Sequence, residues 1–192
     1  MKSFFFTKYF ITDPFEFGNT KEQLSINLTN SLKKHQVDMI CFRDKESKKI
    51  EQLAKIFLDI SKEFHIKKIL INSNIQLALK LGFDGVHLTS KQFSEIEKAK
   101  RDNLYTIISC HSEDEIKLAK RLGSNAVTYS PIFYKEDKGE PKGIDELKDI
   151  IEKYQYEDFS IVALGGIITS SHIEQVKSTY AGGFASIRYF KN

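Results

Sequence analysis

Eight short apolar runs, separated by longer segments rich in lysine and glutamate, constrain the fold of this chain more than any other feature of its sequence. Several runs are apolar at every position, which is typical of strands that are covered on both faces. Between them, the segment from Ile50 to Phe64 places large apolar residues at spacings of three and four, which predicts an amphipathic helix. The runs are Tyr9–Thr12, Met39–Phe42, Ile69–Ile71, Gly85–Leu88, Tyr105–Ser109, Ala126–Tyr129, Ser160–Leu164 and Phe184–Ile187.

Strand and helix patterns that alternate eight times predict a parallel sheet, and eight such units are typical of the closed (β/α)₈ or TIM barrel. The chain has 192 residues, which is just short of the usual size for that fold, so its loops must be short. A doubly wound open sheet is the alternative, but that fold usually has a glycine-rich turn after its first strand, whereas Asp13-Pro14-Phe15 follows the first run here. We therefore predict one compact TIM barrel domain over residues 1–192.

Composition excludes several classes of protein. Hydrophobic residues make up 41% of the chain and charged residues 29%, which is typical of a globular protein rather than a disordered or fibrous one. The net charge of +3 is too small to indicate binding to nucleic acid or to an anionic membrane. Lys8 interrupts the apolar start of the chain, so we interpret that segment as a strand and expect a cytoplasmic protein. Cys41 and Cys110 cannot form a disulfide framework, and we expect both to be small buried thiols.

In a barrel of this type the chemistry takes place at the carboxyl ends of the strands, so the polar residues that follow the apolar runs are the candidates for a site. His87 and His111 could each act as a general acid or base, or could be structural histidines that are held by hydrogen bonds. Arg43 and Lys45 lie two residues apart, so on an extended strand end they would point the same way and suit a diphosphate; an ordinary pair of surface cations is the alternative.

A pair of glycines after the seventh run is the most informative of these features. Gly165 and Gly166 would let backbone N–H groups approach an anion closely, and phosphate sites of barrels commonly use the loops after strands seven and eight. Arg188 follows the eighth run and could add a charge-assisted contact. The alternative is a tight turn followed by a helix that is capped by Ser170 or Ser171.

Several motifs, in order along nearly the whole chain, resemble the thiamine phosphate synthase/TenI family, whose members are compact (β/α)₈ barrels. The motifs are Tyr9-Phe10-Ile11-Thr12-Asp13, Phe42-Arg43-Asp44-Lys45, Ile69-Leu70-Ile71-Asn72, Gly82-Phe83-Asp84-Gly85-Val86-His87-Leu88, Ser109-Cys110-His111-Ser112, Ser130-Pro131-Ile132-Phe133, Ala163-Leu164-Gly165-Gly166-Ile167 and Gly183-Phe184-Ala185.

The resemblance implies a transferase of thiamine biosynthesis that joins hydroxymethylpyrimidine diphosphate to thiazole phosphate and releases diphosphate. It implies a diphosphate side formed by Arg43, Lys45 and Asn72, with Ser109 and Lys138 nearby. It also implies that Gly166, Ile187 and Arg188 surround the thiazole phosphate, together with Gly165. The candidates for catalysis are Lys138, Ser109 and His111.

The chain departs from the family pattern at its metal and catalytic positions. The family holds Mg²⁺ with two aspartates, whereas Ser73 and Gln92 stand at these positions, so the sequence supports Mg²⁺ only weakly. Pro131 stands where TenI-type thiazole tautomerases have a histidine. We therefore expect a protein that binds phosphorylated thiazole, and whether it also performs the coupling is open. The alternative is a non-synthase: a tautomerase-like enzyme or a non-catalytic, regulatory protein that binds thiamine phosphates. The expected partners are small phosphorylated thiamine precursors, and the sequence is compatible with a homodimer.

Overall fold

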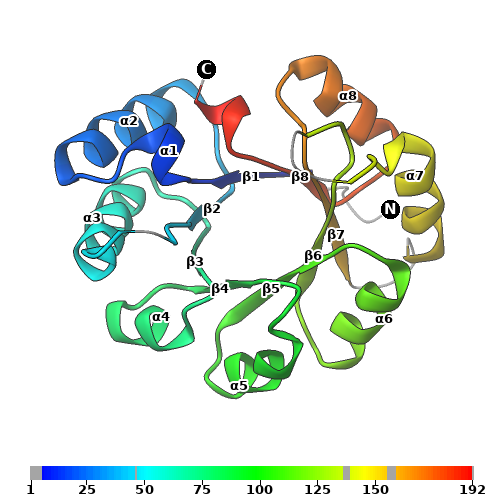
Figure 1. Cartoon of the computed structure of the whole chain (residues 1–192), viewed down its shortest axis with the longest axis horizontal. Coiled ribbons are helices and arrows are strands. Elements are labelled where there is room, and N and C mark those ends of the chain that lie inside the picture. Colours follow the sequence, from blue (N-terminus) through cyan, green and yellow to red (C-terminus); the bar gives the residue numbers. More distant parts are fainter. Residues whose placement is uncertain (1–5, 46, 136–138, 155–158, 192) are drawn as a thin grey trace.

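The computed structural model of the chain describes residues 6–45, 47–135, 139–154 and 159–191. Eight parallel strands pair in sequence order, and β8 pairs with β1, so the sheet closes into a barrel (Figure 1). The closed ring confirms the predicted (β/α)₈ barrel and excludes the open sheet. The strands are β1 (Thr7–Ile11), β2 (Met39–Phe42), β3 (Lys68–Asn72), β4 (Gly85–Leu88), β5 (Tyr105–Cys110), β6 (Ala126–Tyr129), β7 (Ser160–Leu164) and β8 (Gly183–Ser186).

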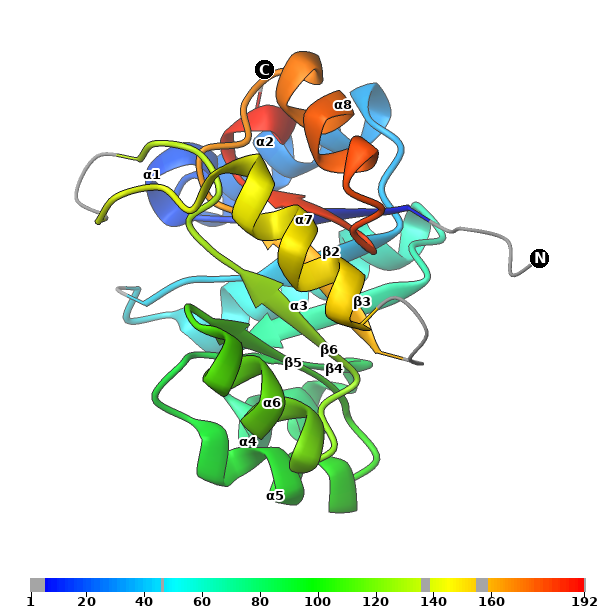
Figure 2. The same cartoon turned by 90° about the vertical axis from the view of Figure 1, so that its right-hand side faces the viewer.

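Helices surround the barrel on its outside (Figures 1 and 2). The helix predicted between Ile50 and Phe64 is α3, which the structure places at Ile50–Glu63. None of the described helices is both long and apolar enough to cross a membrane. The other helices are α1 (Pro14–Phe17), α2 (Lys21–Lys34), α4 (Ile75–Leu81), α5 (Ile96–Arg101), α6 (Glu113–Arg121), α7 (Gly143–Tyr154) and α8 (Ser170–Ser178), with 3₁₀ turns η1 (Phe93–Glu95) and η2 (Arg188–Phe190).

Two apolar clusters hold the layers together. Alternate strand residues such as Met39, Leu70 and Val162 fill the inside of the barrel, while their neighbours in sequence pack under the helices. Cys41 belongs to the inner cluster and Cys110 to the outer one, and both are buried free thiols, as predicted. The inside of the barrel is therefore a packed core, and a ligand can reach only its ends.

The predicted bounds of β2, β4, β6 and β7 agree with the structure, while β3 extends one residue beyond its run at each end and β5 one residue at its carboxyl end. Strands β1 and β8 are shifted toward the amino terminus of the chain. Both strands begin earlier than their apolar runs, because Thr7 pairs with Gly183 in the parallel ladder between them. A Cβ atom at Gly183 would lie 2.2 Å from the carbonyl oxygen of Thr7, so only glycine allows this approach of the two backbones. The first pair of this ladder consists of a polar residue, Thr7, and a glycine, Gly183, and a search for apolar runs cannot detect either.

A substitution at Gly85 tests how closely β4 packs against β5. A Cβ atom there would lie 1.9 Å from the backbone oxygen of Tyr105. We expect Gly85→Ala to lower the free energy of unfolding in urea by about 3 kcal/mol, because the two strands would have to separate. Gly139→Ala is the matched control, since apart from its chain neighbours no described residue lies within 4 Å of its Cβ position. Equal stability of the two variants would contradict this account of the ladder.

Candidate functional site

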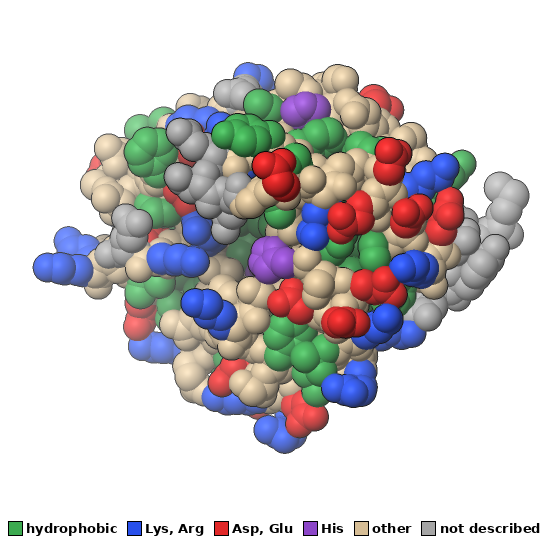
Figure 3. Space-filling model, turned by 45° about the vertical axis from the view of Figure 1, so that its right-hand side comes forward, with side chains coloured by type: hydrophobic (Ala, Val, Ile, Leu, Met, Phe, Trp, Pro, Cys, Tyr) green, Lys and Arg blue, Asp and Glu red, His purple; other side chains and the backbone are tan. Residues whose placement is uncertain are grey.

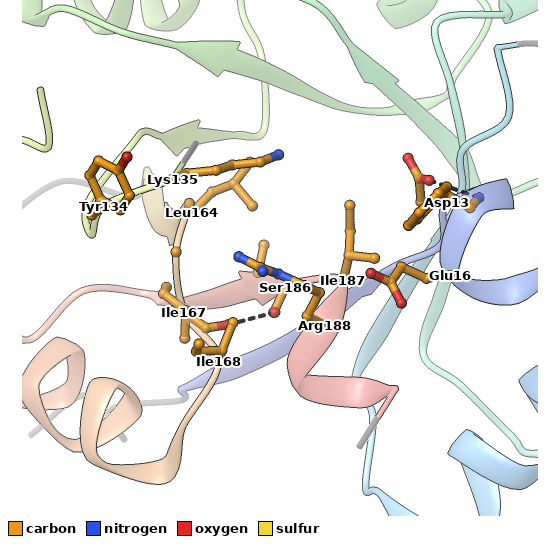
Figure 4. A pocket seen from close by; sticks show the side chains of 14 residues that line it. Asp13, Glu16, Tyr134, Lys135, Leu164, Ile167, Ile168, Ser186, Ile187 and Arg188 are labelled. Atoms are coloured by element: carbon orange, nitrogen blue, oxygen red, sulfur yellow. Dashed lines mark hydrogen bonds between the residues drawn. The ribbon is translucent and has the colours of Figure 1, made fainter. Parts of the chain in front are cut away.

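A cavity of about 770 Å³ opens at the carboxyl end of the barrel, where the segments after β1, β6, β7 and β8 meet. Figure 4 shows the side chain of Ile187 between Asp13 and Glu16 on one side and Leu164 and Lys135 on the other. The cavity thus has an acidic edge, an apolar middle and a basic edge. It lies at the end of the barrel at which the sequence predicts a site.

Arg188 supplies a cation to this cavity. Its side chain points into the cavity (Figure 4), and within the described residues it has no hydrogen-bond or ion-pair partner. A guanidinium group without a protein partner is available to bind a phosphate through charge-assisted hydrogen bonds. On the face of the molecule shown in Figure 3, basic and acidic side chains are interspersed, so the described residues form no large region of one charge on this face.

The turn at Gly165 and Gly166 has a structural reason that does not depend on a ligand. Both glycines have left-handed backbone angles, with φ of +97° and +72°. A Cβ atom at Gly165 would lie 2.8 Å from Cα of Pro131, and one at Gly166 would lie 2.7 Å from the backbone of Phe133. The N–H of Phe133 also donates to the carbonyl oxygen of Gly165 at 3.0 Å. Packing against the loop after β6 therefore requires the two glycines.

Three unpaired backbone N–H groups make this region a candidate for binding an anion. The N–H groups of Gly166, Ile187 and Arg188 have no acceptor within the described part of the chain, and all three residues line the cavity. Backbone N–H groups seldom lack a partner unless water or a ligand supplies one. Unpaired donors from two loops are the arrangement that binds phosphate in many barrels.

Ser186 joins the two loops that carry these donors. Its hydroxyl group donates to the carbonyl oxygen of Ile167 at 2.7 Å and accepts from the N–H of Tyr189 at 3.1 Å. Ser186 could not be identified from the sequence, because its position inside the apolar run Phe184–Ile187 gives no sign of a contact across the site.

Thr169 is the N-cap of helix α8, so the alternative interpretation, which gave this role to Ser170 or Ser171, is wrong. The side chain of Thr169 accepts from the N–H of His172 at 3.2 Å, whereas both serines belong to the first turn of the helix. The ring of His172 stacks on Phe133 with 4.2 Å between centroids, which adds a second contact between α8 and the loop after β6.

Arg43 is joined to the cavity through Asp13. The guanidinium of Arg43 forms an ion pair with the carboxylate of Asp13, and Asp13 lines the cavity. Strand β2 ends at Phe42, so the alternation that predicts a common direction for Arg43 and Lys45 does not extend to Lys45, which is exposed. The ion pair escaped the sequence analysis because its partners are far apart in the sequence.

A polar cluster occupies the inside of the barrel beside the apolar core. Nδ1 of His87 lies 2.9 Å from the hydroxyl oxygen of Tyr9, and Nε2 lies 3.1 Å from Oγ of Ser109 and 3.3 Å from Oγ1 of Thr128. Burial lowers the pKa of His87 to about 4, with a smaller contribution from the positive charge of Arg43, so the imidazole is neutral at pH 7. Nearby, the Asn72 amide donates to the carbonyl oxygen of His87 at 2.9 Å.

The structure does not bring the three candidates for catalysis together. His111 is exposed, its Nδ1 lies 3.0 Å from the carbonyl oxygen of Ser130, and it lines a cavity of about 350 Å³ that shares no lining residue with that of Arg188. Ser109 is half-buried in the cluster around His87. Lys138 lies outside the described residues, so its predicted role is untested.

Comparison with known proteins identifies the family. A family model described as thiamine monophosphate synthase matches residues 8–190. The chain belongs to the thiamine monophosphate synthase family. A thiamine-phosphate synthase of Proteus mirabilis is 31% identical over 150 residues, which cover 76% of this chain and 68% of that one. A protein of Aquifex aeolicus, whose name also refers to thiamine-phosphate synthase, is 33% identical over 180 residues, which cover 91% and 90% of the two chains.

Among solved structures, a thiamine phosphate pyrophosphorylase from Pyrococcus furiosus has the same fold. It superposes with a TM-score of 0.78 at 22% identity, and the match covers 94% of this chain and 85% of that one. At this level of identity the likeness shows the fold alone.

The residues at the metal positions of the thiamine monophosphate synthase family do not fit Mg²⁺. Oε1 of Gln92 accepts from the N–H and hydroxyl groups of Thr89 at 3.1 and 3.0 Å, and Nε2 donates to the carbonyl oxygen of Ser73 at 3.0 Å. The Ser73 hydroxyl donates to Oδ1 of Asn72 at 3.2 Å. Neither residue supplies a carboxylate, which Mg²⁺ usually requires, and the described residues hold no cluster of three His, Cys, Asp or Glu side chains suited to a metal.

His87 predicts how stability depends on pH. Its pKa of about 4 in the folded protein lies below the value of ~6.5 in an unfolded chain, so acid favours unfolding between these two values. From pH 7 to pH 5 the wild-type protein should lose roughly 2 kcal/mol more unfolding free energy than His87→Gln, as measured in urea. Parallel losses in both proteins would show that His87 titrates normally in the fold.

Proposed function

We propose that this member of the thiamine monophosphate synthase family binds a phosphorylated thiazole in the cavity beside β7 and β8. The observation that carries the proposal is the set of unpaired N–H groups on Gly166, Ile187 and Arg188. Together with the guanidinium of Arg188, these groups suit a dianionic phosphate monoester.

The rest of the cavity suits the ring of such a ligand. Leu164 and Ile187 form an apolar surface next to the basic edge, and Tyr134 presents an exposed aromatic ring at the rim. Glu16 lies across the cavity from Lys135, on the same side as the Asp13 carboxylate that is paired with Arg43 (Figure 4), so the end far from the phosphate favours a polar or cationic group. A small heteroaromatic ring with a phosphate at one end matches this order of acidic, apolar and basic groups.

Calorimetric titration of an Arg188 variant with thiazole phosphate tests the proposal. We expect Arg188→Ala to weaken binding on the order of tenfold to a hundredfold, because a charge-assisted contact to the phosphate is lost. Arg121→Ala, at the exposed end of α6, removes the same charge and should bind as the wild type does. The unphosphorylated thiazole alcohol should bind weakly to all three proteins. Equal affinity of wild type and Arg188→Ala for the phosphate would refute the site.

A second candidate function is the coupling itself, with hydroxymethylpyrimidine diphosphate as the other substrate. It is favoured by Arg43, Asn72 and Ser109, which are retained at the carboxyl ends of β2, β3 and β5. The neutral residues Ser73 and Gln92 favour the non-synthase alternative, a tautomerase-like or regulatory thiamine-phosphate binder.

An assay of thiamine phosphate formation distinguishes a synthase from a non-synthase. It contains both substrates and is run with and without Mg²⁺. If the protein is a synthase, Lys138→Ala should abolish product. If only the metal ligands are missing, Ser73→Asp with Gln92→Asp should raise Mg²⁺-dependent turnover at least tenfold, since carboxylates restore the charge that holds the metal. Ser94→Asp, on exposed η1, is the control for added negative charge. Binding of thiazole phosphate without product in any variant would support the non-synthase.

A further inference from the structure

The cluster inside the barrel contains two residues to which neither the family motifs nor the cavity assign a role. Tyr9 and Thr128 come from β1 and β6, on different sides of His87, and both are fully buried. Between them they contact both ring nitrogens of His87, which in turn contacts Ser109. Ser109 is the one member of these four that is not fully enclosed, and it lies near the carboxyl end of β5. The cluster therefore connects a buried tyrosine to a hydroxyl group that can reach a ligand.

The direction of each hydrogen bond in this cluster follows from which groups can donate and which can accept. A neutral imidazole has one N–H and one lone pair, so one ring nitrogen of His87 must accept. The Tyr9 hydroxyl can donate either to Nδ1 or to the Cys41 sulfur, which is the other polar group beside it and a much weaker acceptor. Tyr9 therefore donates to Nδ1, and the proton of His87 resides on Nε2.

The tautomer of His87 determines in which direction the Ser109 hydroxyl group can donate. With its proton on Nε2, His87 donates to Oγ of Ser109 at 3.1 Å, and the Thr128 hydroxyl lies 3.5 Å from the same oxygen. Because Oγ of Ser109 already accepts inside the cluster, its own hydrogen remains for a group outside it. With the opposite tautomer, Nε2 would accept a hydrogen from Ser109, at 3.1 Å, or from Thr128, at 3.3 Å. When Ser109 donates it, only lone pairs of Ser109 remain for a ligand.

We propose that Tyr9 is a positioning residue that holds His87 as its Nε2–H tautomer and so commits the Ser109 hydroxyl to donate toward the mouth of the barrel. This inference rests on the proposed coupling only for the identity of the acceptor, an anionic oxygen of a diphosphate. An anion gains from a donor and is repelled by lone pairs, so the tautomer determines whether Ser109 favours such a ligand.

The tautomer can be measured without a ligand. In long-range ¹H–¹⁵N correlation spectra of protein labelled with ¹⁵N-histidine, we expect the proton of His87 on Nε2 at pH 7. Tyr9→Phe removes the donor to Nδ1 and should shift His87 toward the Nδ1–H form. Tyr105→Phe is the matched control, since Tyr105 packs inside the same barrel without a hydrogen bond to His87, and it should leave the tautomer unchanged. A proton on Nδ1 in the wild type would overturn the proposal.

Inorganic diphosphate then tests the link to Ser109. Ser109→Ala should weaken its binding on the order of tenfold, and Tyr9→Phe should weaken it to a similar extent, while the double variant should lose little more. Wild-type affinity in Tyr9→Phe, or no diphosphate binding by the wild type, would overturn the donor role of Ser109. Neither result would alter the thiazole phosphate site, which the Arg188→Ala titration tests separately.

Discussion

The contact between the Gly165–Gly166 turn and the loop after β6 determines the shape of the mouth of this barrel. Hydrogen bonds of 3.0 Å join Ile132 to Leu164 and Phe133 to Gly165, and a side chain on either glycine would collide with that loop. With the turn held on this side, its other surface lines the cavity. The donors of Gly166 and those at the end of β8 are thereby fixed before a ligand arrives, which lowers the entropic cost of binding.

The inside of the barrel is organised by a different constraint, the burial of a neutral histidine. Apolar residues fill most of the interior, and His87 is accommodated there because Tyr9, Ser109 and Thr128 lie against its two nitrogens. Its low pKa follows from this burial and keeps the cluster uncharged at neutral pH. Ser109, near the carboxyl end of β5, is the member of this cluster that is only half-buried.

The sequence predicts the architecture well because the apolar runs coincide with the strands. The bounds of β2, β4, β6 and β7 agree with the runs, while β1 and β8 start earlier, at a pair that contains a glycine. Gly166 and Arg188 line the cavity at the predicted end of the barrel. The Asp13–Arg43 ion pair and the Tyr9–His87 contact could not be predicted, since only the closed barrel brings these distant segments together.

Family membership does not by itself establish the activity, because at the metal positions of the family Gln92 and Ser73 are neutral and hydrogen-bond within the protein. The proposed phosphate site between the ends of β7 and β8 does not depend on that metal. It can be seen in a crystal structure of the protein soaked with thiazole phosphate. We expect the phosphate oxygens at about 3 Å from the N–H groups of Gly166 and Arg188. A phosphate bound elsewhere, such as beside His111, with the turn left empty, would contradict it.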